Sequence, residues 1–319
     1  MKPANPLELP VIRRNFSIAT AALLLTSLGS LRAAEGDSEL KIGMLSGMFR
    51  DVQPAMVQAM AKPFRDLMLK TTSFTGEVEI LDDPIELADK LKNKKLQLGV
   101  FHGFEFAWAQ QKCDELVPLI VTLPPGGVVQ GLIVVHIDNP AKSVADLGNS
   151  GIGIPRGAKA HSIAYLAKAR SGLEGDCAKP TPQIKLTPED ILNAVASGEQ
   201  KAALVDRCAL DGYKMLQPGG FKALKILAQS EEFPAAVVCY VKGALSEDQA
   251  ARIRTGLTGA TKTPSGKMLM TLWNLKGFSE PSKDYQGSLD TILKAYPMPK
   301  AAMSVEGSKT KAVGPNGGK

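Results

Sequence analysis

Residues 92–102, KNKKLQLGVFH, and residues 196–206, ASGEQKAALVD, share one layout. In each stretch the end of a predicted helix is followed by a polar link, a short apolar strand and one polar residue, and an aromatic-bearing helix comes next. Ligands of open α/β sheets bind beyond the carboxyl ends of the strands. We therefore expect His102-Gly103 and Asp206-Arg207 to face a crevice, each from its own lobe.

Around the first stretch, short apolar runs alternate with amphipathic segments, which is typical of an α/β chain. A proline- and glycine-rich turn, PPGG at residues 124–127, separates two β-rich runs, and the second run is long enough to pass from one lobe to the other. The predicted elements of this half are strands at 40–45, 77–81, 96–101, 116–123 and 128–137 and helices at 54–70 and 84–91.

The same alternation restarts after Asp138-Asn139-Pro140 and predicts a second lobe. Its predicted elements are strands at 152–154, 184–186, 202–205 and 225–227 and helices at 158–170 and 188–196. A β-rich run at 236–241 returns the chain to the first lobe, and Ser246 caps a later helix. We predict that residues 35–133 and 236–299 form lobe 1 and residues 134–235 form lobe 2, with crossings near 134–140 and 229–236.

The two ends of the chain are set apart from this pattern. Arg13-Arg14, the apolar run 18–28 and small residues up to Ala34 have the layout of a signal peptide over residues 1–34. An ordinary secretory route and a twin-arginine route both remain open. Residues 300–319 contain almost no large apolar side chain and are predicted to form a disordered tail.

Composition limits the function classes. The chain has 319 residues, is 44% hydrophobic and lacks the run of about 20 apolar residues that a membrane-spanning helix requires. Its formal charge of +6 comes from 38 basic and 32 acidic residues, with no basic run interleaved with aromatic residues. A nucleic-acid-binding surface is therefore not the first interpretation. The mild positive charge favours a small anionic ligand only if the basic groups converge at one place.

Cysteine and histidine spacing predicts neither a metal site nor a cofactor. No CxxC pair occurs, and no histidine stands near a cysteine at ligand spacing. Export makes the cysteines candidates for disulfides, and we favour buried thiols or one disulfide over metal binding. The residues concerned are Cys113, Cys177, Cys208 and Cys239 with His102, His136 and His161.

The order and spacing of several segments resemble those of the periplasmic substrate-binding components of phosphate, phosphite and phosphonate ABC transporters. The resemblance covers residues from about Leu40 to Tyr296. It implies a two-lobed periplasmic-binding-protein fold of α/β class that closes on its ligand like a hinge, each lobe a mixed, mostly parallel sheet flanked by helices. The segments are KIG at 41–43, LGVFHG at 98–103 with Trp108, GLIVV at 131–135, ALVD at 203–206 with Tyr213, LAQSEEFP at 227–234 and GF at 277–278 with Asp284-Tyr285.

The resemblance also implies where an anion binds. Family members carry a Ser-Thr-Ser-Gly-like loop after the first strand of the second lobe, and here residues 155–162, PRGAKAHS, take its place. Backbone N–H groups and the helix dipole can still attract an anion there, with Arg156 or Lys159 supplying charge in place of hydroxyls. The predicted ligand-binding residues are Arg156, Gly157, Ala158, Lys159, His102, Asp206 and Ser46.

Each of these assignments has a simpler alternative. Arg156 and Lys159 could be solvated residues at a helix start, His102 a loop or packing residue and Asp206 a helix cap. His161 and Tyr165, one turn apart on the same helix face, are interpreted as packing residues.

The resulting functional hypothesis is the extracytoplasmic solute-binding component of an ABC importer. We expect a monomer in the periplasm that takes a small phosphonate- or phosphate-like anion into the cleft and delivers it to a membrane permease. Two alternatives remain: a related binding protein that acts as a ligand sensor or interaction partner without a transporter, and a secreted hydrolase. We favour a protein that is not an enzyme because the sequence has no nucleophile elbow, phosphate-binding loop or metalloprotease helix.

Overall fold

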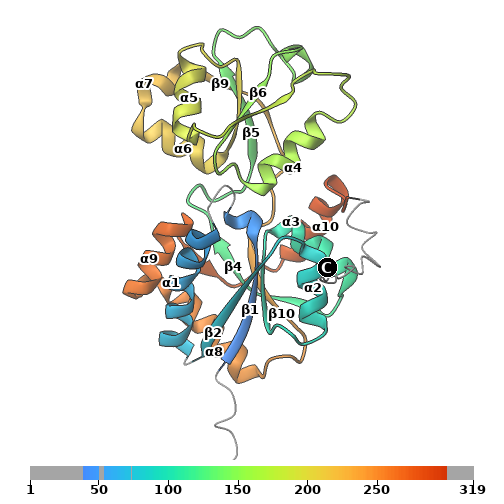
Figure 1. The fold of residues 1–319 in the computed structure, drawn as a ribbon, viewed down its shortest axis with the longest axis vertical. Helices are drawn as coiled ribbons and strands as arrows, with labels where there is room; N and C mark the ends of the chain where they lie inside the picture. Colours follow the sequence, from blue (N-terminus) through green and yellow to red (C-terminus); the bar gives the residue numbers. More distant parts are fainter. Residues whose placement is uncertain (1–38, 50–53, 73, 300–319) are drawn as a thin grey trace, which may run out of the picture. The chain divides into compact units, whose positions relative to one another are not determined.

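The computed structural model describes residues 39–49, 54–72 and 74–299 (Figure 1). The predicted signal peptide, residues 1–34, and the predicted tail, residues 300–319, lie outside this range. No helix within the described ranges combines the length and the apolar character that crossing a bilayer demands.

Lobe 1, the name used here for the six-stranded sheet and the helices that cover it, is built from both halves of the chain. The strands follow the order β11-β4-β10-β3-β1-β2. The strands are β1 (Glu39–Leu45), β2 (Thr75–Leu81), β3 (Leu98–Phe101), β4 (Leu116–Leu123), β10 (Val237–Val241) and β11 (Gly277–Ser279). The α-helices are α1 (Pro54–Thr72), α2 (Pro84–Lys92), α3 (Gly103–Lys112), α8 (Glu247–Thr258), α9 (Pro264–Trp273) and α10 (Tyr285–Ala295).

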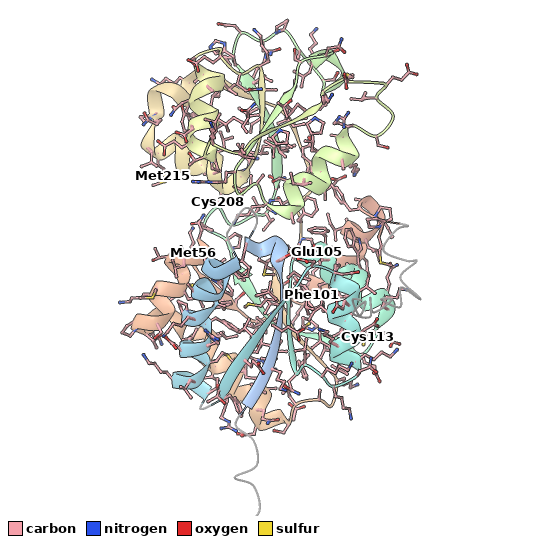
Figure 2. The ribbon with its side chains drawn as sticks, viewed as in Figure 1. Met56, Phe101, Glu105, Cys113, Cys208 and Met215 are labelled. Atoms are coloured by element: carbon pink, nitrogen blue, oxygen red, sulfur yellow. The ribbon has the colours of Figure 1, made fainter. Side chains whose placement is uncertain are left out.

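Helices cover both faces of this sheet. Figure 1 shows α1, α8 and α9 on one side and α2, α3 and α10 on the other. Successive side chains of a strand point to opposite faces, so β3 sends Leu98 and Val100 into one core and Phe101 into the other (Figure 2). All four residues of β3 are buried, which explains why the strand is a continuous apolar run.

Lobe 2, the five-stranded sheet and its helices, has the order β7-β6-β8-β5-β9. Leu132 and Val134 of β5 pack toward α5 and α6, while Ile133 and Val135 pack on the side of α4. The elements are β5 (Gly131–His136), β6 (Ile152–Pro155), β7 (Pro180–Gln183), β8 (Ala202–Asp206), β9 (Leu224–Gln229), α4 (Ala160–Ala169), α5 (Pro188–Ala196), α6 (Arg207–Leu216) and α7 (Pro218–Lys222). Three short 3₁₀ helices complete the two lobes: η1 (Ser46–Phe49), η2 (Ala145–Leu147) and η3 (Ala260–Lys262).

The α/β class and the mixed sheets are confirmed, but the expectation of mostly parallel sheets needs correction. Among the described residues, four strand pairs are parallel and five are antiparallel. The strands that follow a change of lobe, β5 and β10, run antiparallel to both of their neighbours. Each sheet is therefore parallel on one side and antiparallel on the other.

The chain changes sheets earlier than the sequence indicated. The strand expected over 128–137 begins only at Gly131, and all of β5 belongs to the lobe 2 sheet, so the first crossing is 124–130 rather than 134–140. The second crossing, 230–236, agrees with the expected position. The two crossing segments lie side by side, because Val129 and Phe233 form an antiparallel bridge with Phe233 N donating to Val129 O at 2.8 Å. Strand propensity alone could not show where the apolar run leaves one sheet.

One edge strand is also displaced from its predicted position. A strand was expected at 184–186, but β7 is Pro180–Gln183, and the Ile184 side chain is 70% exposed. Two prolines in β7 are tolerated because this strand pairs on one side only, with β6. Apolar content therefore gave a misleading signal at this edge.

The four cysteines form no disulfide in the structure. Cys113 and Cys239 are buried, and Cys177 and Cys208 are partly exposed. This agrees with the buried-thiol interpretation for two of the four.

Candidate functional site

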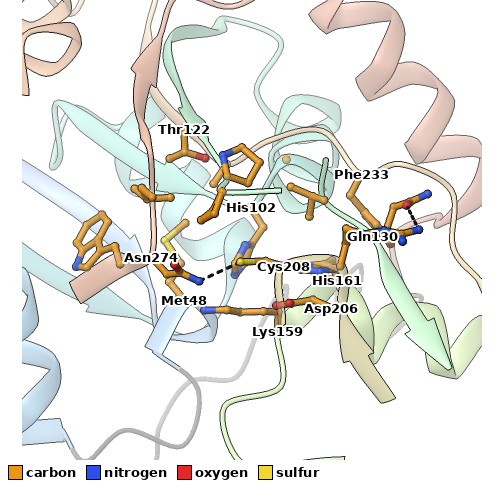
Figure 3. Close-up of a pocket in the computed structure, with 18 of the residues that line it drawn as sticks. Met48, His102, Thr122, Gln130, Lys159, His161, Asp206, Cys208, Phe233 and Asn274 are labelled. Carbon is orange, nitrogen blue, oxygen red and sulfur yellow. Dashed lines mark hydrogen bonds between the residues drawn. The ribbon is translucent and has the colours of Figure 1, made fainter. Parts of the chain in front are cut away.

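A cavity of about 300 Å³ lies where strand ends of both lobes meet the two crossing segments (Figure 3). His102 follows β3, and Asp206 ends β8, so residues 92–102 and residues 196–206 both reach one cavity. The helix starts of α3, α4 and α6 also contribute lining residues, among them Gly103, Lys159 and Arg207. The lining thus combines several independent chain segments.

On the side of lobe 1, His102 occupies the N-cap position of α3 without capping it through its side chain. Its Nε2 atom is buried and has no hydrogen-bond partner among the described residues. The pKa of His102 is lowered to about 3, mainly by burial; the neighbouring His161 and Lys159 contribute to this shift, and a hydrogen bond to the Gly47 backbone partly offsets it. The imidazole is therefore neutral at physiological pH, with one nitrogen that donates and one that accepts.

On the side of lobe 2, α4 begins with an unusual N-terminus. Gly157 has a φ of +73°, which glycine tolerates best, and the turn it makes leads to Lys159 as N-cap. The Lys159 side chain does not cap α4, and the first turn of this helix has no acidic residue. The Lys159 ammonium has no hydrogen-bond or ion-pair partner within the described ranges, although a cation at a helix N-terminus is unfavourable without an anion nearby.

The first turn of α4 also brings His161 to the cavity. Its side chain is only 6% exposed, and its Nε2 has no hydrogen-bond partner in the described part of the chain. Burial lowers the pKa of His161 to about 3, Lys159 adds to the effect, and the Gln130 backbone opposes it. A second neutral imidazole thus lies beside the uncapped helix start.

At the start of α6, Asp206 behaves differently. Its Oδ1 accepts a hydrogen bond from the backbone N–H of Ala209 at 2.6 Å, so the carboxylate caps its own helix. Burial raises the pKa of Asp206, and the Ala209 N–H and the Lys159 charge partly offset this. The helix start is satisfied within the protein.

Arg207 and Cys208 are also tied to protein partners. Arg207 Nη2 donates to Gln130 Oε1 and to Gln229 Oε1, both at 3.2 Å. Asn274 Nδ2 donates to the sulfur of Cys208 at 3.1 Å (Figure 3). Burial raises the pKa of the Cys208 thiol, and a protonated thiol is a poor nucleophile.

Much of the remaining wall is apolar. Phe104 and Phe233 meet edge to face with ring centroids 5.6 Å apart, and Phe49 and Trp273 do the same at 5.8 Å. In Figure 3, Met48 and Asn274 lie toward one end of the drawn site and Phe233 toward the other. Within the described residues, no group of three or more His, Cys, Asp or Glu side chains is arranged to hold a metal ion.

The structure brings four of the seven predicted ligand-binding residues to the cavity: His102, Gly157, Lys159 and Asp206. The other three do not line it. Arg156 is exposed, Ala158 is buried, and Ser46 donates through Oγ to Asp82 Oδ1 at 2.5 Å. For Asp206, the structure shows the helix cap that the sequence left as an alternative.

Sequence reasoning missed His161 and Gln130, among other lining residues, whereas Arg207 was expected to face the crevice and does line the cavity. His161 was assigned to packing, and its ring does contact Phe233 with centroids 5.5 Å apart. Its place in the first turn after Lys159 was a signal that it could also face a ligand. Gln130 gave no such signal, because it lies in a crossing segment whose position the sequence did not predict.

Residues 47–285 match the family described as periplasmic substrate-binding proteins of phosphonate ABC transporters. The chain is 26% identical over 217 residues to a protein of Escherichia coli (strain K12) described as an aliphatic sulfonates-binding protein; the match covers 67% of this chain and 63% of that protein, which is less than two thirds of its length.

Two solved structures share the fold. One is XAC2383 from Xanthomonas citri bound to a chloride ion, with a TM-score of 0.58, 16% identity and coverage of 84% of this chain and 99% of that one. The other is PhnD1 from Prochlorococcus marinus (MIT 9301) in complex with methylphosphonate, with a TM-score of 0.56, 13% identity and coverage of 81% and 98%.

Proposed function

The chain belongs to the family of periplasmic substrate-binding proteins of phosphonate ABC transporters, and from this premise we propose that it is the extracytoplasmic solute-binding component of an ABC importer. Its solute is a small anion of the phosphonate or sulfonate kind, bound in the cavity between the strand ends of the two lobes. The start of α4 is the single observation that carries this proposal.

That helix start offers an anion three favourable features. The N–H groups of the first turn receive no cap from the Lys159 side chain, and the helix dipole places partial positive charge beside them. Lys159 adds a positive charge that forms no ion pair among the described residues, although Asp206 lies close enough to interact with it, and His161 Nε2 has no hydrogen-bond partner among those residues. In this proposal these groups take the place of the hydroxyl-rich loop found in other members of the family.

His102 contributes from the opposite lobe. Its buried Nε2 lacks a partner among the described residues, and an oxyanion could accept a hydrogen bond from it. An anion held by His102 and by the start of α4 would touch both lobes and would favour their closed arrangement. In this proposal Gly157 permits close backbone approach, and Asp206 maintains the site by capping α6.

The remaining parts of the proposal follow from the family. The protein resides in the periplasm after export, binds its solute as a monomer without chemical turnover and presents it to a membrane permease. Residues 1–34, the predicted signal peptide, lie outside the described ranges and would direct the export.

Isothermal titration calorimetry of the purified protein tests the binding function. The probes are phosphate, methylphosphonate, methanesulfonate and larger alkyl phosphonates and sulfonates. We expect stoichiometric heat and no product with at least one organic anion, and a ligand at 100 times its dissociation constant should stabilise the protein by about 2.7 kcal/mol.

Two alanine variants locate the site. Lys159→Ala removes the cavity cation and should weaken binding at least about tenfold. Arg156→Ala removes an equal charge three residues earlier, but its exposed side chain lies outside the cavity lining, so affinity should change by less than about twofold. If no anion binds, the proposed function is wrong; if Arg156→Ala has the larger effect, the site is misplaced.

A further inference from the structure

Tyr296 packs behind the wall of the cavity, outside the lining formed by the described residues. This residue directly follows α10 in lobe 1, is 5% exposed, and stacks on Phe233 with ring centroids 4.6 Å apart. Phe233 lines the cavity and also meets two other lining residues, Phe104 at 5.6 Å and His161 at 5.5 Å. A displacement of Tyr296 would therefore reach the cavity wall through a single aromatic ring.

The backbone of Tyr296 is fixed to lobe 1. Its N–H donates to the carbonyl of Ile292 in α10 at 2.7 Å, and its carbonyl accepts from Nε1 of Trp108 in α3 at 2.8 Å. The Trp108 ring in turn meets Phe104 edge to face with centroids 5.0 Å apart. Tyr296 therefore moves together with lobe 1.

The side chain of Tyr296 contacts lobe 2 and the second crossing segment. Its hydroxyl donates to Oε2 of Glu231, which lies in the crossing segment 230–236, at 2.6 Å. The ammonium of Lys168, in α4, forms an ion pair with Oε1 of Glu231 and lies 4.6 Å from the centroid of the Tyr296 ring. Burial alone would raise the pKa of Glu231, but the hydrogen bonds from Lys168 and Tyr296 outweigh burial and lower that pKa. The carboxylate is therefore ionised at neutral pH, and these three residues form an interlobe cluster.

Helix α4 connects the interlobe cluster with the proposed anion site. Lys159 and His161 lie at its start and line the cavity, and Lys168 lies in its last turn, two turns beyond His161. Because the backbone hydrogen bonds of a helix keep its length fixed, contacts that hold Lys168 against lobe 1 also fix the start of α4 relative to His102 on the other side of the cavity.

The contacts of the cluster are strong enough to bias the lobes and too weak to lock them. A partly exposed ion pair or a cation–π contact changes an equilibrium by a few-fold, and a hydrogen bond to a charged group changes it by about tenfold or more. The side chains of Lys168 and Glu231 are 40% and 44% exposed, so water can replace their contact when the lobes move apart.

We infer that Tyr296, Glu231 and Lys168 are positioning residues: they hold the lobes in the arrangement in which α4 and His102 share one cavity, and they set the affinity for the solute from outside that cavity. The inference rests on the proposed function, because it takes this cavity as the anion site. The apparent affinity of a site falls with the fraction of molecules in the binding arrangement. Loosening the cluster therefore weakens binding although every lining residue is unchanged.

Removal of one hydroxyl tests the role of Tyr296. Tyr296→Phe keeps the ring on Phe233 and loses the hydrogen bond to Glu231, so calorimetry with phosphate, methylphosphonate and methanesulfonate should show at least about threefold weaker binding of each anion that binds the wild type. Tyr213→Phe is the matched control, because the Tyr213 hydroxyl donates to Asn193 Oδ1 at 2.7 Å entirely within lobe 2. This control should lose stability but keep its affinity within about twofold.

Reversal of one charge tests the role of Lys168. Lys168→Glu places two carboxylates opposite each other and should weaken anion binding at least about tenfold, whereas Lys168→Arg keeps the charge over the Tyr296 ring and should bind within about twofold of the wild type. Lys62→Glu makes the same reversal at an ion pair within α1, where Lys62 lies 2.7 Å from Asp66, and should leave affinity unchanged. Circular dichroism melts establish that each variant is folded.

Small-angle X-ray scattering of the ligand-free proteins tests the cluster without any anion. Lys168→Glu should shift the radius of gyration to a larger value than that of the wild type, and Lys62→Glu should not. Unchanged scattering of Lys168→Glu would overturn the inference. So would cluster variants that bind as tightly as the wild type or more tightly, or an equal loss of affinity in Tyr213→Phe. If none of the three anions binds the wild type, the proposed function is wrong, while the scattering shift still decides whether the cluster holds the lobes.

Discussion

Helices α4 and α6 both begin at the cavity, but their N-cap residues have opposite chemistry. The N-cap of α6 is Asp206, whose carboxylate accepts from the Ala209 N–H and opposes the positive end of the dipole. The N-cap of α4 is Lys159, which donates only and adds positive charge to a helix start that has no side-chain cap. One helix start is capped by its own N-cap side chain, and the other is not.

The difference between the two N-caps indicates which helix start can bind an anion. A stability-optimised sequence would place an acid or a hydroxyl at both positions, because either would satisfy first-turn N–H groups. The chain does so at α5 and α8, where Thr187 and Ser246 form complete capping boxes. At α4 the N-cap side chain accepts from none of the first-turn N–H groups, and such trade-offs between stability and function are common at binding sites.

Reversing the charge at the α4 cap should give the largest effect. Lys159→Asp replaces a cation with a residue that caps helices well, and the backbone there, φ −70° and ψ 150°, already suits a cap. We expect anion affinity to fall at least about 100-fold and the ligand-free protein to gain about 1 kcal/mol of unfolding free energy. Calorimetry and urea denaturation measure the two quantities.

Lys201→Asp provides the control for that change. Lys201 is exposed and lies outside the cavity lining, so the same charge reversal there should alter neither affinity nor stability appreciably. If Lys159→Asp destabilised the ligand-free protein as much as it weakened binding, the view of α4 as an unsatisfied helix start would be wrong.

The corresponding change at α6 should act on stability first. Asp206→Ala removes the hydrogen bond to Ala209 and should cost about 1–2 kcal/mol of unfolding free energy. Asp206→Asn keeps a capping oxygen and removes the charge, so it should cost less and should strengthen anion binding a few-fold. Denaturation and calorimetry of the two variants distinguish the effect of the capping hydrogen bond from the effect of the charge. Equal destabilisation by both variants would show that the charge of Asp206, and not its capping hydrogen bond, stabilises the protein.

The sequence predicted this contrast only in part. The paired stretches ending at His102 and Asp206 located two strand ends, and each does reach the cavity, because strand-to-helix junctions depend on local patterns of apolar and polar residues. The capping role of Asp206 was foreseeable for the same reason. The basic loop before α4 was also recognised, as a departure from the family's hydroxyl-rich loop.

What the sequence could not supply was long-range placement. Arg156 and Lys159 look equivalent in the chain, and only the left-handed turn at Gly157 and the packing of α4 separate an exposed cation from a cavity cation. Gln130 and Phe233 enter the site because the crossing segments pair with each other, a contact between residues about a hundred positions apart. Periodicity carries no information about such pairs.

The pH dependence of the free energy of unfolding should show the same contrast between α4 and α6, with a smaller effect than the substitutions at the N-caps. The pKa of His161 on α4 is lowered to about 3 from 6.5, so between these values the unfolded chain binds a proton that the folded protein does not. The contribution of the neutral His161 ring to the free energy of unfolding is fully present above pH 6.5, and it is lost as the pH falls toward 3. From pH 7 to 6 this amounts to about 0.7 kcal/mol.

Asp206 on α6 has a raised pKa, so its contribution has the opposite sign: above pH 3.8 the folded protein retains a proton longer than the unfolded chain, and stability falls as pH rises. His161→Phe keeps an aromatic ring beside Phe233 and should flatten the loss on the acid side, while Asp206→Asn should flatten the loss on the alkaline side. Urea denaturation without ligand at pH 5, 6, 7 and 8 measures both slopes. If His161→Phe leaves the acid-side slope unchanged, folding does not lower the pKa of His161, and the ring is not held neutral at acid pH at the start of α4.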